Sequence, residues 1–238
     1  MEVAFGITGK DYVLIASDTS AARSIVKMKA NEDKQRVVGK HLVMAYSGEP
    51  GDTLQFSEYV ERNLRLYQIR NHIPLRPTSA ASWVRTQLAT SLRSRKPYSV
   101  NLLLGGYDPT TSQPSLYWID YLGTLGTVPY AAHGYGAYFA TSTMDRWHDP
   151  EGDLDAGLDL LRKCIAELET RFIVNLGGWT IRVADASGVR QLNLDGTPYV
   201  PPQQPPAPAA PAAAAVAQQA GVQDALGAGQ GQEVAASA

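Results

Sequence analysis

The fold is decided by residues 3–48, which read VAFGITGKDYVLIASDTSAARSIVKMKANEDKQRVVGKHLVMAYSG. Four largely apolar runs lie in this stretch: Val3–Ile7, Tyr12–Ser17, Gln35–Val38 and His41–Ser47. The turn formers Gly9-Lys10-Asp11 separate the first two runs, and Gly39-Lys40 separate the last two. Apolar and β-branched runs joined by such turns predict two antiparallel β-hairpins.

The hydrophobic period changes after residue 48. Phe56, Val60 and Leu64 recur at helical spacing behind Asp52, which we expect to be the N-cap, and a second helix is expected after Thr78. Further strands are predicted at 98–107, 116–122, 179–184 and 189–194, and further helices at 134–144 and 153–169. Hairpins alternating with helix pairs predict an α+β fold. In it, two antiparallel sheets stack and a helix pair flanks each outer face, which makes a four-layer αββα sandwich.

Composition separates a folded body from a tail. The 38 residues after position 200 include 14 Ala, 7 Gln, 6 Pro and 4 Gly, and they contain no aromatic or basic residue. They offer too little apolar surface to offset the entropy cost of ordering. We expect a folded domain over residues 1–199 and a disordered Ala/Pro/Gln/Gly-rich C-terminal tail over 200–238. Residues 1–200 carry 21 basic and 21 acidic groups, and such a neutral body argues against nucleic acid or an anionic membrane as a partner.

The single cysteine, Cys164, cannot form an internal disulfide, which favours a reducing compartment, the cytoplasm or the nucleus. Cys164 falls on the apolar side of its predicted helix, where we expect a small buried hydrophobe and not a nucleophile. The four histidines are not spaced as a metal-binding set, and the sequence lacks phosphate-binding and dinucleotide-binding motifs. No run approaches the roughly 20 apolar residues of a membrane span. We therefore expect no metal, no cofactor and no membrane-spanning segment.

Several short segments together resemble one protein family. Those that carry the resemblance are Ser17-Asp18-Thr19-Ser20, Lys34, Ser47-Gly48, Gly51-Asp52 and Gly105-Gly106-Tyr107-Asp108. In this order they resemble a beta subunit of the 20S proteasome, a member of the N-terminal nucleophile hydrolase fold. The resemblance extends from Val3 to about Leu194. A further set of segments resembles, more specifically, the beta subunit that occupies one particular position of the ring. These segments lie at 51–53, 67–70, 93–98, 105–108, 119–124 and 132–135.

The resemblance implies a set of catalytic residues, of which this sequence has only some. Active members use a threonine that becomes the N-terminal residue. Its free α-amine, with an unperturbed pKa of about 8, can then take the proton of the threonine hydroxyl. Here Met1-Glu2 precedes the first predicted strand, so no threonine is expected at that place. Asp18, Lys34 and Gly48 match the family's catalytic Asp, its Lys and the glycine whose N–H serves the oxyanion.

Two other family motifs are altered. The family's Gly-Ser-Gly is Gly134-Tyr135-Gly136 here, and its Arg-Asp…Ser-Gly-Gly is Arg171-Phe172…Leu176-Gly177-Gly178. These changes and the absent threonine imply that no residue is catalytic. Asp18, Lys34 and Gly48 are then vestigial matches that serve a turn, an ion pair and a strand-to-helix connection.

The resemblance therefore implies a non-catalytic structural subunit, which forms part of the beta ring and the chamber wall in ubiquitin-dependent protein degradation. The implied partners are other beta subunits of the same ring, beta subunits of the opposite ring, alpha-ring subunits and assembly chaperones. Arg85, Arg93, Arg95 and Lys96 either meet an acidic partner or mark a solvated helix end. Two other functions stay open: a self-processing amidohydrolase, which needs a newly exposed N-terminal Ser, Thr or Cys, and a free-standing binding module.

Overall fold

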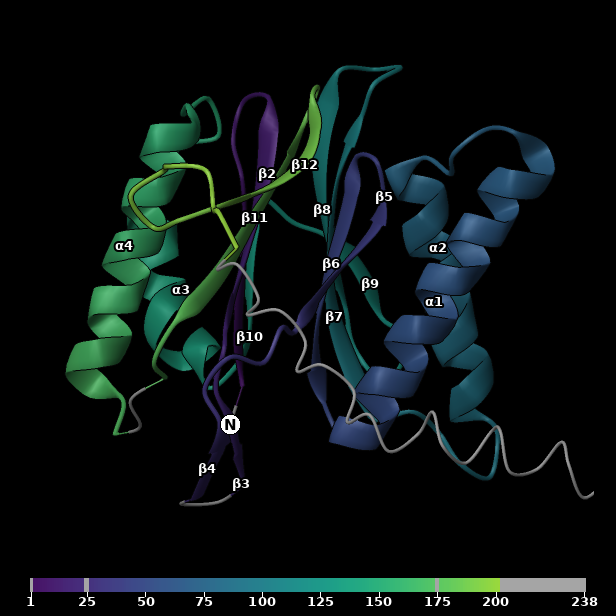
Figure 1. Cartoon of the computed structure of the whole chain (residues 1–238), viewed down its shortest axis with the longest axis horizontal. Coiled ribbons are helices and arrows are strands. Elements are labelled where there is room, and N and C mark those ends of the chain that lie inside the picture. Colours follow the sequence, from purple (N-terminus) through teal and green to yellow (C-terminus); the bar gives the residue numbers. More distant parts are fainter. Residues whose placement is uncertain (1, 24–25, 174–175, 202–238) are drawn as a thin grey trace, which may run out of the picture. The chain divides into compact units, whose positions relative to one another are not determined.

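Two five-stranded antiparallel sheets stack in the computed structural model (Figure 1). The first sheet has the order β10-β1-β2-β11-β12, with β1 Val3–Thr8, β2 Tyr12–Asp18, β10 Tyr130–Gly134, β11 Trp179–Asp185 and β12 Gly188–Leu192. The second has the order β5-β6-β7-β8-β9, with β5 Gln35–Gly39, β6 Leu42–Gly48, β7 Val100–Asp108, β8 Gln113–Ile119 and β9 Leu125–Thr127. Two short strands, β3 (Ala21–Arg23) and β4 (Val26–Lys29), form a separate hairpin.

A pair of helices covers the outer face of each sheet (Figure 1). Helices α1 (Pro50–Asn71) and α2 (Pro77–Leu92) pack on the sheet that contains β6 and β7. Helices α3 (Gly136–Trp147) and α4 (Leu154–Arg171) pack on the sheet that contains β1 and β2. The predicted α+β arrangement, with two antiparallel sheets between two helix pairs, is confirmed.

The structure describes residues 2–23, 26–173 and 176–201, and the chain up to Tyr199 forms one compact unit. All but the first two residues of the expected tail, 200–238, lie outside these described residues, so its disorder stays a prediction. No helix in the described part of the chain is both long enough and apolar enough to cross a bilayer.

Strand periodicity explains why the central strands are continuous apolar runs. In β2, Leu14 packs with α3 and α4, whereas Val13 and Ile15 belong to the core between the two sheets. In β7, Leu104 packs with α1 and α2, and Leu103 belongs to the inter-sheet core. Successive side chains of a strand point to opposite faces, so a strand covered on both faces needs apolar residues at every position.

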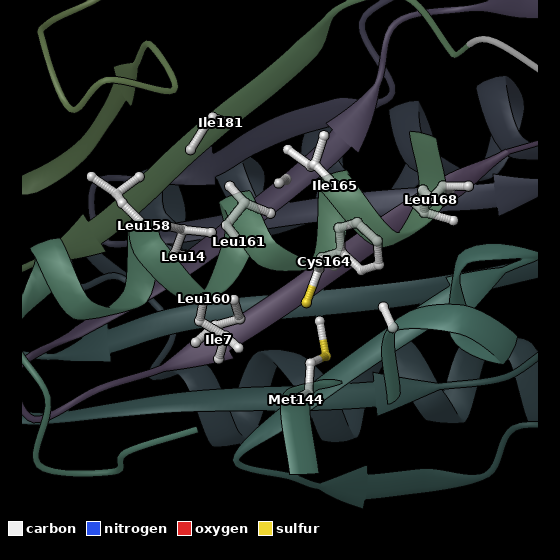
Figure 2. Close-up of a cluster of buried hydrophobic side chains, with 14 of the residues drawn as sticks. Ile7, Leu14, Met144, Leu158, Leu160, Leu161, Cys164, Ile165, Leu168 and Ile181 are labelled. Carbon is white, nitrogen blue, oxygen red and sulfur yellow. The ribbon is translucent and has the colours of Figure 1, made fainter. Parts of the chain in front are cut away.

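The core beneath α3 and α4 contains the lone cysteine (Figure 2). Cys164 is fully buried beside Leu161, Ile165 and Leu168, and Met144 of α3 contributes to the same cluster. Burial raises the pKa of the Cys164 thiol to about 12. The expectation of a buried position for Cys164 is confirmed.

Three predicted helix starts are wrong, and one of them is that of α2, which was expected after Thr78 and begins at Pro77. Asp52 is not the N-cap, because α1 begins at Pro50 behind Glu49, and the Asp52 carboxylate instead accepts the backbone N–H of Ser99 at 3.0 Å. Proline at the first helical position lacks only an N–H that the helix leaves unpaired, so it starts a helix readily. The helix predicted from residue 134 begins at Gly136, since Gly134 pairs with β1 as the last residue of β10.

Four strands were not predicted from the sequence: β3, β4, β9 and β10. They are three to five residues long and lie largely exposed or half-buried. Without an apolar run of strand length, periodicity gives no signal. The position of β10 also depends on a partner that is distant in the chain, β1, whereas β3 pairs with β4 and β9 pairs with β8, which are neighbours in sequence.

Candidate functional site

The three residues singled out in the sequence lie at one end of the stacked sheets. Asp18 is the last residue of β2, Gly48 is the last residue of β6, and Lys34 directly precedes β5. This end lies beside the β3–β4 hairpin (Figure 1). The structure brings Asp18 and Lys34 into direct contact, and Gly48 joins them through another residue, Glu2, described below.

Asp18 and Lys34 form a buried ion pair. The Lys34 Nζ atom lies 2.8 Å from both carboxylate oxygens of Asp18 and donates a third hydrogen bond of 2.7 Å to the carbonyl of Ser20. The Asp18 side chain is 0% exposed and that of Lys34 is 5% exposed. The same carboxylate accepts the backbone N–H groups of Val3 at 2.9 Å and of Ser20 at 3.1 Å. All three ammonium protons and both carboxylate oxygens therefore have partners, which is the condition for burying such a pair without a large penalty.

Gly48 has a backbone conformation and surroundings that only glycine fits. Its φ is 141°, and a Cβ atom at this position would lie 2.1 Å from the carbonyl oxygen of Ser99. The strand β6 ends here, and α1 begins two residues later at Pro50. Gly48 thus makes the strand-to-helix turn, and its N–H points at the end of β1, where it donates to the Glu2 carboxylate at 2.9 Å.

Glu2 is the residue of this site that sequence reasoning missed. It directly precedes β1, so its side chain lies at the place where the family resemblance puts a nucleophile, and Val3 beside it is bonded to Asp18. The pKa of the Glu2 carboxyl is raised, first by burial, while the bond from Gly48 N–H and the charge of Lys34 oppose this rise. The available signal was the position of Glu2 at the start of β1, but its acceptor role depends on Gly48, 46 residues away.

Aromatic rings stand at the two positions where the family has a serine and an aspartate. Tyr135 follows Gly134, which pairs with Val3, so the ring belongs to the same end of β1. The Tyr135 ring stacks on Phe172 with 5.9 Å between centroids, and Phe139 of α3 lies 6.0 Å from Phe172. The neighbouring Leu176 is buried, and its carbonyl accepts the Ser20 hydroxyl. At both positions the side chains are aromatic and pack against each other.

The chemistry available at this end follows from these contacts. Acyl transfer needs a hydroxyl or thiol nucleophile beside a base and an N–H group that is free to bind the developing oxyanion. The structure places a carboxylate, Glu2, against the Gly48 N–H, and the ammonium of Lys34 is fully engaged by Asp18 and Ser20. Within the described ranges, no three His, Cys, Asp or Glu side chains gather as a metal site requires.

A fold of two stacked sheets between helix pairs, with a matched Asp, Lys and Gly at the strand ends, defines the N-terminal nucleophile hydrolase class. A family model described as "Proteasome subunit" matches residues 2–185 of the chain. A probable proteasome subunit beta type-4 from Neurospora crassa is 50% identical over 195 residues, which cover 82% of this chain and 96% of that protein. Proteasome subunit beta type-4 from Saccharomyces cerevisiae is 42% identical over 193 residues, which cover 81% of this chain and 98% of that protein.

A plant relative is also a proteasome beta subunit, like the two fungal ones. Proteasome subunit beta type-2-A from Arabidopsis thaliana is 46% identical over 190 residues, which cover 80% of this chain and 92% of that protein. The narrower resemblance of the segments quoted above is to the type-2 subunit, the name that the plant relatives carry. The chain belongs to the proteasome subunit family and, within it, to the beta subunits.

Proposed function

We propose that this chain is a non-catalytic, structural beta subunit of the 20S proteasome core particle. It forms part of a beta ring and of the wall of the proteolytic chamber, and it contributes to ubiquitin-dependent protein degradation without cleaving peptide bonds itself. Its domain spans residues 1–199, and residues 200–238 form a disordered appendage. The particle works in the cytoplasm and the nucleus.

The observation that carries this proposal is the hydrogen bond from Gly48 N–H to the Glu2 carboxylate. In an active relative this N–H would be free for the oxyanion of a tetrahedral intermediate, and a preorganised donor of this kind accounts for a large part of the rate enhancement. A carboxylate already fills the donor here, and its negative charge would repel an oxyanion. A peptide carbonyl therefore does not find the Gly48 N–H free, and Glu2, which occupies this place, has no hydroxyl to act as a nucleophile.

The surrounding residues support the same function. Lys34 has no free proton to share, since its three hydrogen bonds go to Asp18 and Ser20. Tyr135 and Phe172 stack where the family has hydrogen-bonding side chains. A buried ion pair and a packed aromatic pair hold β1 and β2 in place, which is a role in stability and not in catalysis.

The implied partners are neighbouring beta subunits of the same ring, beta subunits of the opposite ring, alpha-ring subunits and assembly chaperones. Heterologous contacts between different subunits of a ring need complementary patches of both signs. The equal numbers of acidic and basic residues in the body suit this requirement.

The proposal is tested by treating core particles that contain this chain with a threonine-directed electrophile, followed by peptide mapping. We expect no adduct on any residue of this chain, while catalytic subunits in the same sample are labelled and serve as the positive control. A labelled Ser, Thr or Cys of this chain would refute the non-catalytic assignment.

Two measurements separate the alternatives. A self-processing amidohydrolase requires a new N-terminal Ser, Thr or Cys, so N-terminal sequencing of the mature chain decides that case. Native mass spectrometry of cell extracts decides the other, because a free-standing module would appear only as a 25.7 kDa monomer. We expect the chain in a large hetero-oligomer.

A further inference from the structure

Charge is distributed very unevenly along this chain. Between Glu61 and Asp108 no acidic residue occurs, although the intervening 46 residues contain eight basic ones. These are Arg62, Arg65, Arg70, Arg76, Arg85, Arg93, Arg95 and Lys96. Because residues 1–200 carry 21 charges of each sign, the rest of the body has 13 basic and 21 acidic residues. The neutral total therefore hides a positively charged part and a negatively charged part.

The basic residues of this segment belong to α1, to α2 or to the ends of α2, and these two helices form a single layer (Figure 1). All eight are on exposed residues. Arg62 pairs with Glu58, and Arg76 pairs with Asp108. The other six have no ion pair within 4.0 Å to any carboxylate of the described residues. This layer therefore carries an excess of positive charge at its surface, with eight basic residues against Asp52, Glu58 and Glu61 of α1.

The densest part of this layer is the loop Arg93–Lys96 at the C-terminal end of α2, which we call the basic loop. Its backbone is held by local hydrogen bonds: Ser94 N–H donates to the carbonyl of Ser91 at 2.9 Å, and Tyr98 N–H donates to the Ser91 hydroxyl at 2.9 Å. The three cations, Arg93, Arg95 and Lys96, are therefore presented from an ordered turn. Ordering before binding reduces the entropy cost of association.

A hollow of about 310 Å³ adjoins the basic loop. Its lining includes the aromatic rings of Phe56, Tyr59 and Tyr98, with Ser94 and Lys96 of the loop also at the hollow. Phe56 and Tyr98 pack with 5.1 Å between ring centroids, which gives the hollow a rigid apolar wall. The rest of the lining is polar, so a recess with one aromatic wall beside cations accepts a segment that carries an apolar side chain next to carboxylates.

The helix dipole explains only part of this arrangement. A cation near the C-terminal end of a helix is favourable, but the effect is lost beyond the last turn. The last turn of α2 contains no basic residue, Arg93 is its C-cap, and Arg95 and Lys96 lie beyond it. The dipole also gives no reason for 46 residues without an acidic group. A complementary charge supplied by another molecule accounts for both features.

We propose that the basic loop and the adjoining hollow bind an acidic surface segment of a neighbouring proteasome subunit. The inference rests on the proposed function, since it takes the neighbour to be a subunit of the same particle. The partner segment has carboxylates that pair with Arg93, Arg95 and Lys96 and one apolar side chain that enters the hollow. A protein is favoured over a nucleic acid because the body as a whole carries no excess of positive charge to attract a polyanion.

The first test measures incorporation of tagged variants into core particles by native mass spectrometry. The charge reversal Arg93→Glu/Arg95→Glu is compared with a control of equal charge change, Lys10→Glu/Lys40→Glu, at exposed lysines outside the α1–α2 layer. We expect the first variant to be incorporated at least about tenfold less than the unaltered chain, and the control within about twofold. The conservative variant Arg93→Lys/Arg95→Lys is expected to be incorporated normally, because it keeps the charge.

Equal incorporation of the two reversal variants would overturn the proposal. Absence of the unaltered chain from every large particle would instead refute the proposed function, so the two failures are distinguishable. A photoreactive residue replacing Thr90, which lines the hollow, covers the case in which a reversal variant misfolds. We expect its crosslinks to map to an acidic segment of another proteasome subunit. Crosslinks to segments without carboxylates, or to RNA, would refute the acidic-protein partner.

Discussion

Replacing Lys34 by methionine is expected to lower the unfolding free energy of this protein by about 3–5 kcal/mol, because it leaves a buried carboxylate without its counter-charge. Asp18 is fully buried, and Lys34 supplies two of its hydrogen bonds, both of 2.8 Å. After the replacement, the carboxylate keeps only the N–H groups of Val3 and Ser20. For a fold of this size, the loss corresponds to a drop of about 6–20 °C in Tm.

The matched control is Lys29→Met, which removes the lysine of an exposed ion pair with Glu32. Lys29 and Glu32 lie 2.6 Å apart, but their side chains are 52% and 43% exposed. Water screens such a pair and solvates the carboxylate that remains, so the expected cost is about 0–1 kcal/mol. The two replacements are chemically identical, and they differ in burial.

The assay is urea unfolding of the purified chain, followed by circular dichroism. A double replacement, Asp18→Asn/Lys34→Met, extends the test, because asparagine keeps an acceptor oxygen for Val3 N–H but carries no charge. We expect the double variant to be more stable than Lys34→Met alone. If Lys34→Met costs no more than Lys29→Met, the view of Asp18 and Lys34 as a buried structural pair is refuted.

Three further predictions concern neighbouring residues. Gly48→Ala is expected to lower the unfolding free energy by about 3 kcal/mol or more, because its Cβ would clash with the Ser99 carbonyl and its φ suits only glycine. Gly51→Ala is the control and is expected to be tolerated, since a Cβ there meets nothing within 4 Å; thermal melting compares the two variants. Glu2→Gln is expected to be at least as stable as the unaltered chain at about pH 7, since burial raises the pKa of Glu2 and the charged form therefore costs stability above that pKa. This advantage should vanish in urea titrations below about pH 4.5, where the carboxyl of the unaltered chain is protonated in both states; an advantage that grew on acidification would contradict the assigned direction. Cys164 is expected to resist a thiol reagent in the folded chain and to react only in denaturant, since burial removes access and raises its pKa to about 12; rapid native labelling would contradict its place in the core.

Much of the fold was accessible from local pattern. The runs around Val13 and Leu103 are apolar at successive positions because both strand faces are covered, and the helices show their buried faces through residues such as Phe56 and Val60. The helix start at Asp52 was mispredicted because two features competed, an acidic residue in the first turn and a proline two positions earlier, and the proline marks the true start.

The candidate site likewise contains residues that the sequence could predict and residues whose role only the structure shows. Asp18, Lys34 and Gly48 stand at the ends of predicted strands, so their place in the family motif was visible in the sequence. The role of Glu2 was not visible, because its partner Gly48 is contributed by the other sheet. The stack of Tyr135 on Phe172 likewise joins residues from two different segments and has no local signature.

By itself, the sequence determined the strand and helix order, the antiparallel pairing through tight turns, and the membership of a beta-subunit family. The element order and the pairing follow from periodicity and turn chemistry, which act over a few residues at a time, whereas the family membership follows from the resemblance of short segments such as Ser17–Ser20 and Ser47-Gly48. Only the tertiary structure decided that the Glu2 carboxylate accepts the Gly48 N–H and that Lys34 forms a buried ion pair with Asp18. The physical reason is that burial and hydrogen bonding depend on which distant residues meet, and the stacking of the two sheets sets those meetings.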